Sequence, residues 1–105
     1  MTFKIGDWVQ IPYYDGNDAV QTGSGRITAM YQHHFYPDDY QFFRLEWHEV
    51  ARKDTMTGFP IWRKKTKGFN SLFPLELIQK KLLVTPIGQS NQEYLFNPNF
   101  NYFLN

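Results

Sequence analysis

The sequence predicts an all-β, mainly antiparallel fold in which one small sheet of short strands curls into a barrel. Three segments between residues 7 and 50 alternate apolar and polar residues with a period of two, as half-buried strands do. No long stretch shows the 3.6-residue period of an amphipathic helix. Polar stretches rich in Gly, Asn and Asp separate the apolar segments and predict long loops.

The first strand is expected over residues 7–11, with Val9 and Ile11 on its inward face. Pro12 lacks a backbone N–H, so the strand should end there or lie at a sheet edge. Residues 13–25 are polar and turn-forming, and they predict a long, mobile loop.

The second and third strands are expected over residues 26–32 and 42–50. The third has the clearest alternation in the chain. Arg44, Glu46 and His48 face outward there, where charges can pair across strands. The inward faces of the two strands carry Ile27, Ala29, Tyr31, Phe43, Leu45 and Trp47.

The second half of the chain is less regular. Residues 51–70 predict a polar loop, with a short strand as an alternative at 59–62. Residues 72–78 fit either a short strand or a single helical turn, and residues 82–87 predict a final strand. This half is expected to add Leu77, Val84 and Ile87 to the core.

Residues 89–105 differ in composition from the rest, because Asn and Gln dominate and the aromatic residues show no clear period. This pattern predicts an irregular C-terminal tail, loosely ordered or packed on a neighbour. The barrel domain is therefore expected to span residues 1–88.

Composition excludes several classes of protein. A chain of 105 residues makes one small domain, and 19% aromatic content helps so small a domain bury apolar area. Without cysteine there is no disulfide and no thiolate metal site. No secretory signal or membrane-spanning run is visible, so we expect a soluble intracellular protein that does not bind membranes.

Motifs of common enzymes are also missing from the sequence. It has no Gly-rich phosphate loop, no HExxH and no nucleophile elbow. His33, His34 and His48 lack the spacing of a metal-ligand set, and loop polarity explains the first two better. We therefore expect a protein that is not an enzyme and holds no metal or cofactor.

Charge is spread unevenly along the chain. Residues 1–50 carry three basic and seven acidic residues, net −4, whereas residues 51–70 carry six basic and one acidic, net +5. Cations beside aromatic rings can hold phosphates while a ring stacks on a base, although a solvated loop is the simpler alternative. The candidate nucleic-acid-binding residues are Arg52, Lys53, Trp62, Arg63, Lys64, Lys65 and Lys67.

Aromatic residues near the predicted loops are a second candidate site. Several rings around a pocket with a nearby carboxylate, from Asp15, Asp38 or Asp39, can bind a methylated lysine by cation–π attraction. Packing in the core is the alternative role for such rings. The candidate peptide-binding residues are Trp8, Tyr13, Tyr14, Tyr36 and Tyr40.

Five short motifs occur in a fixed order along residues 5–87. They are Gly6-Asp7-x-Val9, Gly25-Arg26-Ile27-x-Ala29-Met30-Tyr31, Phe43-x-Leu45-x-Trp47, Leu72-Phe73-Pro74-x-Glu76-Leu77-Ile78 and Val84-Thr85-Pro86-Ile87. This order resembles the bromo-adjacent homology (BAH) domain, an elaborated SH3- or Tudor-like barrel of chromatin proteins. Trp47 is followed by His48 where that family usually has an aromatic residue.

The resemblance implies a non-catalytic interaction module of a nuclear, chromatin-associated protein that binds a protein partner or a histone tail. Residues 94–98, Tyr-Leu-Phe-Asn-Pro, also resemble the end of accessory regions in fungal and plant transposon proteins. That second resemblance implies the alternative function, a DNA- or RNA-binding accessory domain of a transposon-derived protein that acts through the basic loop 62–69.

Overall fold

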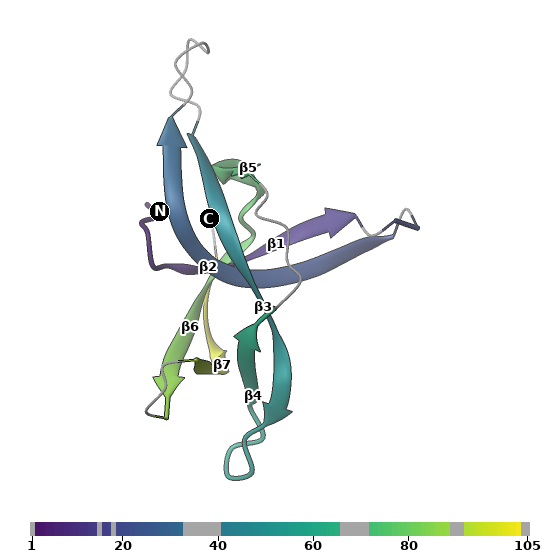
Figure 1. Ribbon diagram of the computed structural model, residues 1–105, viewed down its shortest axis with the longest axis vertical. Coiled ribbons are helices and arrows are strands. Elements are labelled where there is room, and N and C mark those ends of the chain that lie inside the picture. The colour runs from purple at the N-terminus through teal and green to yellow at the C-terminus, as the bar shows by residue number, and fades with distance from the viewer. Residues whose placement is uncertain are drawn as a thin grey trace.

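The computed structural model describes residues 2–14, 16–17, 19–32, 41–65, 72–88 and 92–103, with side chains up to residue 97. These residues form seven strands and one single-turn 3-10 helix (Figure 1). They are β1 (Trp8–Tyr14), β2 (Val20–Gln32), β3 (Gln41–Lys53), β4 (Pro60–Lys64), β5 (Leu72–Pro74), η1 (Leu75–Leu77), β6 (Lys80–Ile87) and β7 (Glu93–Phe103). Within these ranges no helix is long and apolar enough to cross a membrane.

Six strands close into an antiparallel barrel. Their order is β2–β1–β6–β7–β4–β3, and β3 pairs with β2 to complete the ring, while β5 adds to β3. The predicted all-β, antiparallel, curled barrel is therefore confirmed. Strands β1 to β4 are successive neighbours, and η1 precedes β6, which returns to β1. This arrangement is consistent with SH3- and Tudor-like barrels.

The two longest strands, β2 and β3, bend around the barrel. Each has 13 residues, and Figure 1 shows the strong curve of β2. The pairing register shifts between Ile27 and Ala29 in β2, and between Val50 and Arg52 in β3. Such irregularities increase local bending and twist, which lets a small sheet close.

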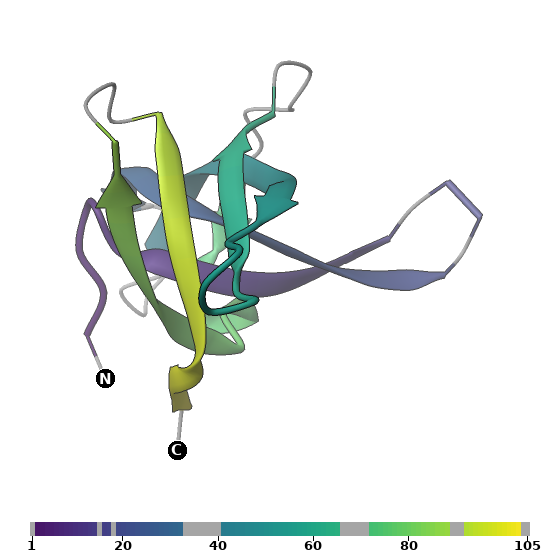
Figure 2. The ribbon, with the colours of Figure 1, turned by 90° about the horizontal axis from the view of Figure 1, so that it is seen from below.

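The loop predicted at residues 13–25 is wrong for most of its length. β1 continues through Pro12, which lies opposite Thr22, and β2 begins at Val20, so a long hairpin extends from the barrel (Figure 2). The glycines here allow close packing instead of a turn. A Cβ on Gly25 would lie 2.3 Å from the backbone O of Glu46.

The expected irregular tail is a strand over residues 93–103. β7 lies between β6 and β4, and Figure 2 shows the three strands side by side. Its Phe96 ring stacks on Trp62 with centroids 4.6 Å apart, so apolar contact outweighs the Asn-rich composition. At residues 72–78, both predicted alternatives occur in succession, as β5 and then η1.

The apolar side chains form two clusters on opposite faces of β1, because the adjacent residues Trp8 and Val9 belong to different clusters. The first cluster, named the apolar core, consists of Val9, Ile11, Ile27, Phe43, Leu45 and Ile78. The second, named the aromatic core, consists of Trp8, Trp62 and Leu82, with the partly buried Val84, Tyr94 and Phe96 against them.

The sequence located the apolar core well and the aromatic core poorly. Five predicted core residues are fully buried: Val9, Ile11, Ile27, Phe43 and Leu45. Five others are only half-buried: Ala29, Trp47, Leu77, Val84 and Ile87. The prediction for Tyr31 is wrong, since it is 45% exposed and its hydroxyl accepts a hydrogen bond from Arg44 Nε. Buried apolar residues that were not predicted are Trp8, Ile61, Trp62, Ile78 and Leu82.

The Gly6-Asp7 motif has a structural role at the start of β1. Gly6 has a φ of 98°, which favours glycine, and its N–H donates to the backbone O of Ile27. The buried Asp7 carboxylate accepts from the backbone N–H of Lys4 at 2.9 Å and pairs with Lys81 Nζ at 3.2 Å. These contacts join the N-terminal turn to β2 and β6.

Candidate functional site

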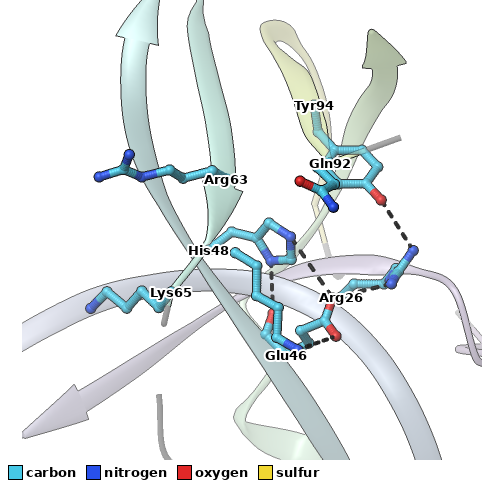
Figure 3. A pocket seen from close by; sticks show the side chains of 8 residues that line it. Arg26, Glu46, His48, Arg63, Lys65, Gln92 and Tyr94 are labelled. Carbon is cyan, nitrogen blue, oxygen red and sulfur yellow. Dashed lines mark hydrogen bonds and ion pairs between the residues drawn. The ribbon is translucent and has the colours of Figure 1, made fainter. Parts of the chain in front are cut away.

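A cleft of about 640 Å³ lies where β2, β3, β4 and the start of β7 meet (Figure 3). Its size is in the range of small-ligand sites. Its lining, named the cationic cleft, consists of Arg26, Glu46, His48, Arg63, Lys64, Lys65, Gln92 and Tyr94. Four of these side chains are cations and one is a carboxylate, so the cleft favours anions.

Strand pairing brings these residues together. Arg26 lies opposite Glu46 across β2 and β3, and His48 lies opposite Lys64 across β3 and β4. Glu46 and His48 are two residues apart in one strand, so their side chains share a face. Trp8 lies opposite Arg26, which places the aromatic core on the same face.

Glu46 is the centre of the polar network in the cleft. Its Oε1 accepts a hydrogen bond from Arg26 Nη2 at 3.1 Å, and its Oε2 pairs with Lys64 Nζ at 3.5 Å. The Glu46 side chain is only 20% exposed. These charge-assisted contacts fix the carboxylate between two cations.

Arg26 is also held against aromatic rings. Its guanidinium carbon lies 5.8 Å from the ring centroid of Trp8 and 5.9 Å from that of Tyr94. Nη1 donates to the Tyr94 hydroxyl at 3.5 Å. Cation–π contact and the ion pair with Glu46 together orient the planar guanidinium at the cleft.

His48 is buried at the floor of the cleft. Its ring packs edge-on against Trp8, with centroids 4.5 Å apart, and against Tyr94 at 5.5 Å. Burial lowers the pKa of His48 below its usual 6.5, because the charged ring would lose contact with water. The nearby charges of Arg26 and Lys64 lower the pKa further. The backbone carbonyl and the carboxylate of Glu46 raise it, but by less. The imidazole is therefore neutral at pH 7.

The remaining cations border the cleft. Arg63 Nε pairs with Glu49 at 3.5 Å, and the Arg63 side chain is 62% exposed whereas that of Glu49 is 39% exposed. Lys65 forms no ion pair with any residue that the structure describes. Figure 3 shows the side chains of Arg63 and Lys65 projecting away from His48, so they form a positive rim above the buried floor.

The predicted basic residues separate into three groups. Arg63, Lys64 and Lys65 line the cleft as one set. Arg52 instead pairs with Glu93, and Lys53 is exposed near the β3–β4 turn, outside the lining. Lys67 lies outside the described residues.

Trp62 does not serve as the surface ring that the sequence predicted beside the cations. It is 6% exposed and lies in the aromatic core, stacked on Phe96. A ring this buried has no free face for a base. The Tyr94 ring is half-buried and lines the cleft, so it gives an aromatic surface beside the cations.

The predicted aromatic site does not assemble from the described residues. Trp8 is 8% exposed in the aromatic core, and Tyr13 lies on the opposite face of β1. Tyr14 is 77% exposed near the tip of the hairpin. Tyr36 and Tyr40 lie outside the described residues, and so do the proposed carboxylates Asp15, Asp38 and Asp39.

A second, smaller cleft of about 380 Å³ includes one of the predicted aromatic residues. Tyr13 and Trp47 meet there at an interplanar angle of 65°, with centroids 5.5 Å apart. Glu49 also lines this space, which we name the Tyr–Trp cleft. Two rings beside a carboxylate can attract an organic cation.

Five cleft residues were not among the sequence candidates: Arg26, Glu46, His48, Gln92 and Tyr94. For Glu46 and His48 the signal was present, because both belong to the outward set of the third strand. For Arg26 the signal was the alternation in the second strand, which leaves Arg26 on the outward face when Ile27 faces inward. Gln92 and Tyr94 could not be predicted as cleft residues, because the sequence of β7 shows no clear period and the strand itself was not expected.

Comparisons of the chain with protein-family models, with curated proteins and with solved structures found no match. The chemistry of the two clefts is therefore the basis for inferring function. In the cationic cleft, fixed cations surround a neutral imidazole and a single carboxylate. That arrangement can bind an anionic ligand.

Proposed function

We propose that this protein is a non-catalytic nucleic-acid-binding module whose cationic cleft holds backbone phosphates. The observation that supports this most strongly is the gathering of Arg26, Arg63, Lys64 and Lys65 around one cleft that contains a single carboxylate. Arginine and lysine contacts to phosphate supply most of the sequence-independent affinity for nucleic acid.

Local charge supports this proposal better than total charge does. The whole chain carries a net charge of only +1, but residues 51–70 carry +5. Three of the six basic residues in that segment, Arg63, Lys64 and Lys65, line the cleft. Folding adds Arg26 of β2, so the lining has four cations and one carboxylate. The positive field is thus concentrated where a ligand would sit, and such a field raises the local concentration of anions.

The size of the cleft suits a single strand. Its 640 Å³ is bordered by exposed cations at the rim and by the Tyr94 ring inside. Single-strand binders combine a positive groove along the backbone with aromatic surfaces for the bases. We therefore expect single-stranded DNA or RNA to bind better than a duplex.

The test is fluorescence anisotropy with labelled single-stranded oligonucleotides over a series of salt concentrations. Affinity should fall steeply with salt, with a logarithmic slope of about 0.7 per phosphate contact. The double variant Lys64→Ala/Lys65→Ala should weaken binding and flatten that slope by about one contact or more.

A matched control removes the same charge elsewhere. Lys4 and Lys53 are exposed and outside the cleft, so Lys4→Ala/Lys53→Ala should leave the slope nearly unchanged. The hydrogen bond from Lys4 to Asp7 uses the backbone N–H and survives this change. Absence of binding by the unmodified protein at low salt would reject the proposal.

A second candidate function is peptide binding by a BAH-like module of a nuclear, chromatin-associated protein. The observation that favours it is the Tyr–Trp cleft, in which Tyr13 and Trp47 lie at 65° beside Glu49. A methylated lysine of a histone tail is the chemistry that such rings attract. The order of BAH-like motifs along the chain supports the same reading.

Titration with lysine-methylated histone peptides tests this second function. Tyr13→Ala should abolish peptide binding, while Lys64→Ala should leave it intact, because Lys64 lies outside the lining of the Tyr–Trp cleft. The peptide-binding function would be rejected if Tyr13→Ala bound the peptide normally and the lysine variant did not. Equally strong binding of unmethylated peptides would also reject it.

A further inference from the structure

We propose that the cationic cleft reads a hydrogen-bond donor on the bound nucleotide through Nε2 of His48. The inference rests on the proposed nucleic-acid binding and adds a selective contact to it. Phosphate contacts alone carry no information about which nucleotide is bound. A buried acceptor beside the phosphate site supplies such information.

The hydrogen bonds of the ring define Nε2 as an acceptor. Nδ1 lies 2.9 Å from the backbone O of Glu46, and a carbonyl oxygen can only accept, so Nδ1 carries the proton and donates. In a neutral imidazole the other nitrogen then presents a lone pair. Nε2 therefore needs a donor from outside the ring.

No described residue supplies that donor. His48 is 6% exposed, and its Nε2 is the buried side-chain atom without a hydrogen-bond partner among the described residues. Glu46 Oε1 lies 3.9 Å from Nε2, but it is itself an acceptor. An unmet buried acceptor is unfavourable, so its position on the wall of a ligand-sized cleft points to a ligand group.

The neighbouring groups restrict what that ligand group can be. Nε2 and Glu46 Oε1 form a pair of acceptors 3.9 Å apart, and Arg26 Nη2 lies 3.1 Å from the same Oε1. An O–H or N–H placed between the two acceptors is favoured there, while a bare phosphate oxygen would face two lone pairs. The cations then hold the phosphate, and the acceptor pair holds the donor.

Two parts of a nucleotide carry such a donor. The ribose 2′-hydroxyl is one, and it is the group by which proteins distinguish RNA from DNA. The amino and imino groups of the bases are the other. Both present the same chemistry to Nε2, and suitable probes separate them.

The experiment measures the affinity of four probes of one length for the unmodified protein and for His48→Phe. The probes are single-stranded RNA, its 2′-O-methyl analogue, DNA of the same sequence, and DNA with abasic sites. Phenylalanine keeps a ring against Trp8 and Tyr94 and removes the acceptor.

Each source of the donor predicts its own pattern. If the ribose hydroxyl is read, RNA binds about threefold to tenfold more tightly than the 2′-O-methyl and DNA probes, and His48→Phe abolishes the difference. If a base is read, RNA and DNA bind alike, and His48→Phe weakens both by a similar factor while abasic DNA is unaffected.

Other outcomes overturn the inference. If His48→Phe binds every probe as the unmodified protein does, the donor contact is absent although nucleic-acid binding stands. If no probe binds the unmodified protein, the proposed function fails, and the inference fails with it.

A second measurement needs no variant, which matters if His48→Phe does not fold. The ¹⁵N chemical shift of the His48 Nε2 should change when the tightest-binding probe is added, because an acceptor nitrogen responds to a new hydrogen bond. A shift that stays constant at saturation contradicts the proposal.

Discussion

The two faces of β1 carry cores of opposite character. On one face, the apolar core includes five residues with 0% exposure and is built from aliphatic side chains and Phe43. On the other, the aromatic core abuts Arg26, Glu46 and His48. The two clusters therefore differ in role. The apolar core stabilises the barrel, whereas the aromatic core lies beside the charged residues of the cationic cleft.

The largest effect is expected from opening the apolar core. Phe43→Ala removes a fully buried ring that packs against Phe73, and it should lower the free energy of unfolding by about 3–5 kcal/mol. Phe43→Leu keeps most of the volume and should cost less. Chemical denaturation measures both, and a loss below about 1 kcal/mol for the alanine variant would contradict a close-packed core here.

A smaller effect is expected from crowding the contact between β2 and β3. Gly25→Ala places a Cβ 2.3 Å from the Glu46 backbone O and 2.9 Å from Leu45 Cγ, and it should cost about 1–3 kcal/mol. At Gly16 nothing lies within 4 Å, so Gly16→Ala should change stability by less than about 0.5 kcal/mol. Equal thermal stability of the two variants would show that the strands are not in close contact.

These glycines also show why the sequence predicted the fold class better than the strand limits. Alternation in residues 7–11 and 42–50 is a local property, so the barrel and the apolar core could be predicted. Residues 20–25 read as a loop because glycine is a turn signal unless a facing side chain fills its space. That facing residue is Trp47 for Gly23, and it is distant in sequence.

The candidate site could be predicted only where its residues are adjacent in sequence. Arg63, Lys64 and Lys65 are adjacent in sequence, so their positive charge was visible before the fold was known. Trp62 looked like their aromatic neighbour, but its pairing with Tyr94 directs it into the aromatic core. Which residues meet at the cleft depends on long-range register, and local patterns do not encode it.

The cationic cleft can be made more positive by neutralising the Glu46 carboxylate. Glu46→Gln releases Arg26 and Lys64 from their ion pairs, so affinity for single-stranded oligonucleotides at low salt should rise about threefold to tenfold. Stability should fall by only about 1 kcal/mol or less, because both cations are partly exposed. Anisotropy titration measures the affinity. Glutamine keeps an acceptor oxygen beside His48, so a decrease would show that the negative charge of Glu46 is itself needed for binding.

The smallest effect on stability is expected from His48→Phe at neutral pH, because the change removes an unmet acceptor and one hydrogen bond together. Its pH dependence is more informative. The folded-state pKa of His48 lies below 6.5, so as pH falls through about 6.5 the unfolded chain takes up a proton first, and the stability of the unmodified protein decreases.

That decrease should be absent in His48→Phe. The groups facing His48 are Glu46, Arg26 and Lys64, and they are unchanged in this variant. Thermal unfolding between about pH 7 and pH 5 compares the two proteins. Parallel curves would indicate that the pKa of His48 is the same in the folded and the unfolded protein, which contradicts a pKa lowered by burial.

The proposed binding of nucleic acid is confined to the cationic cleft and excludes the rest of the barrel. Titration of ¹⁵N-labelled protein with a single-stranded oligonucleotide, followed by backbone amide chemical shifts, tests it most directly. We predict that amides around Arg26, Glu46, His48 and Lys64 shift progressively, while those of Tyr13 and Tyr14 in the hairpin do not. Shifts confined to the hairpin, or no shifts at low salt, would show that nucleic acid does not bind in this cleft.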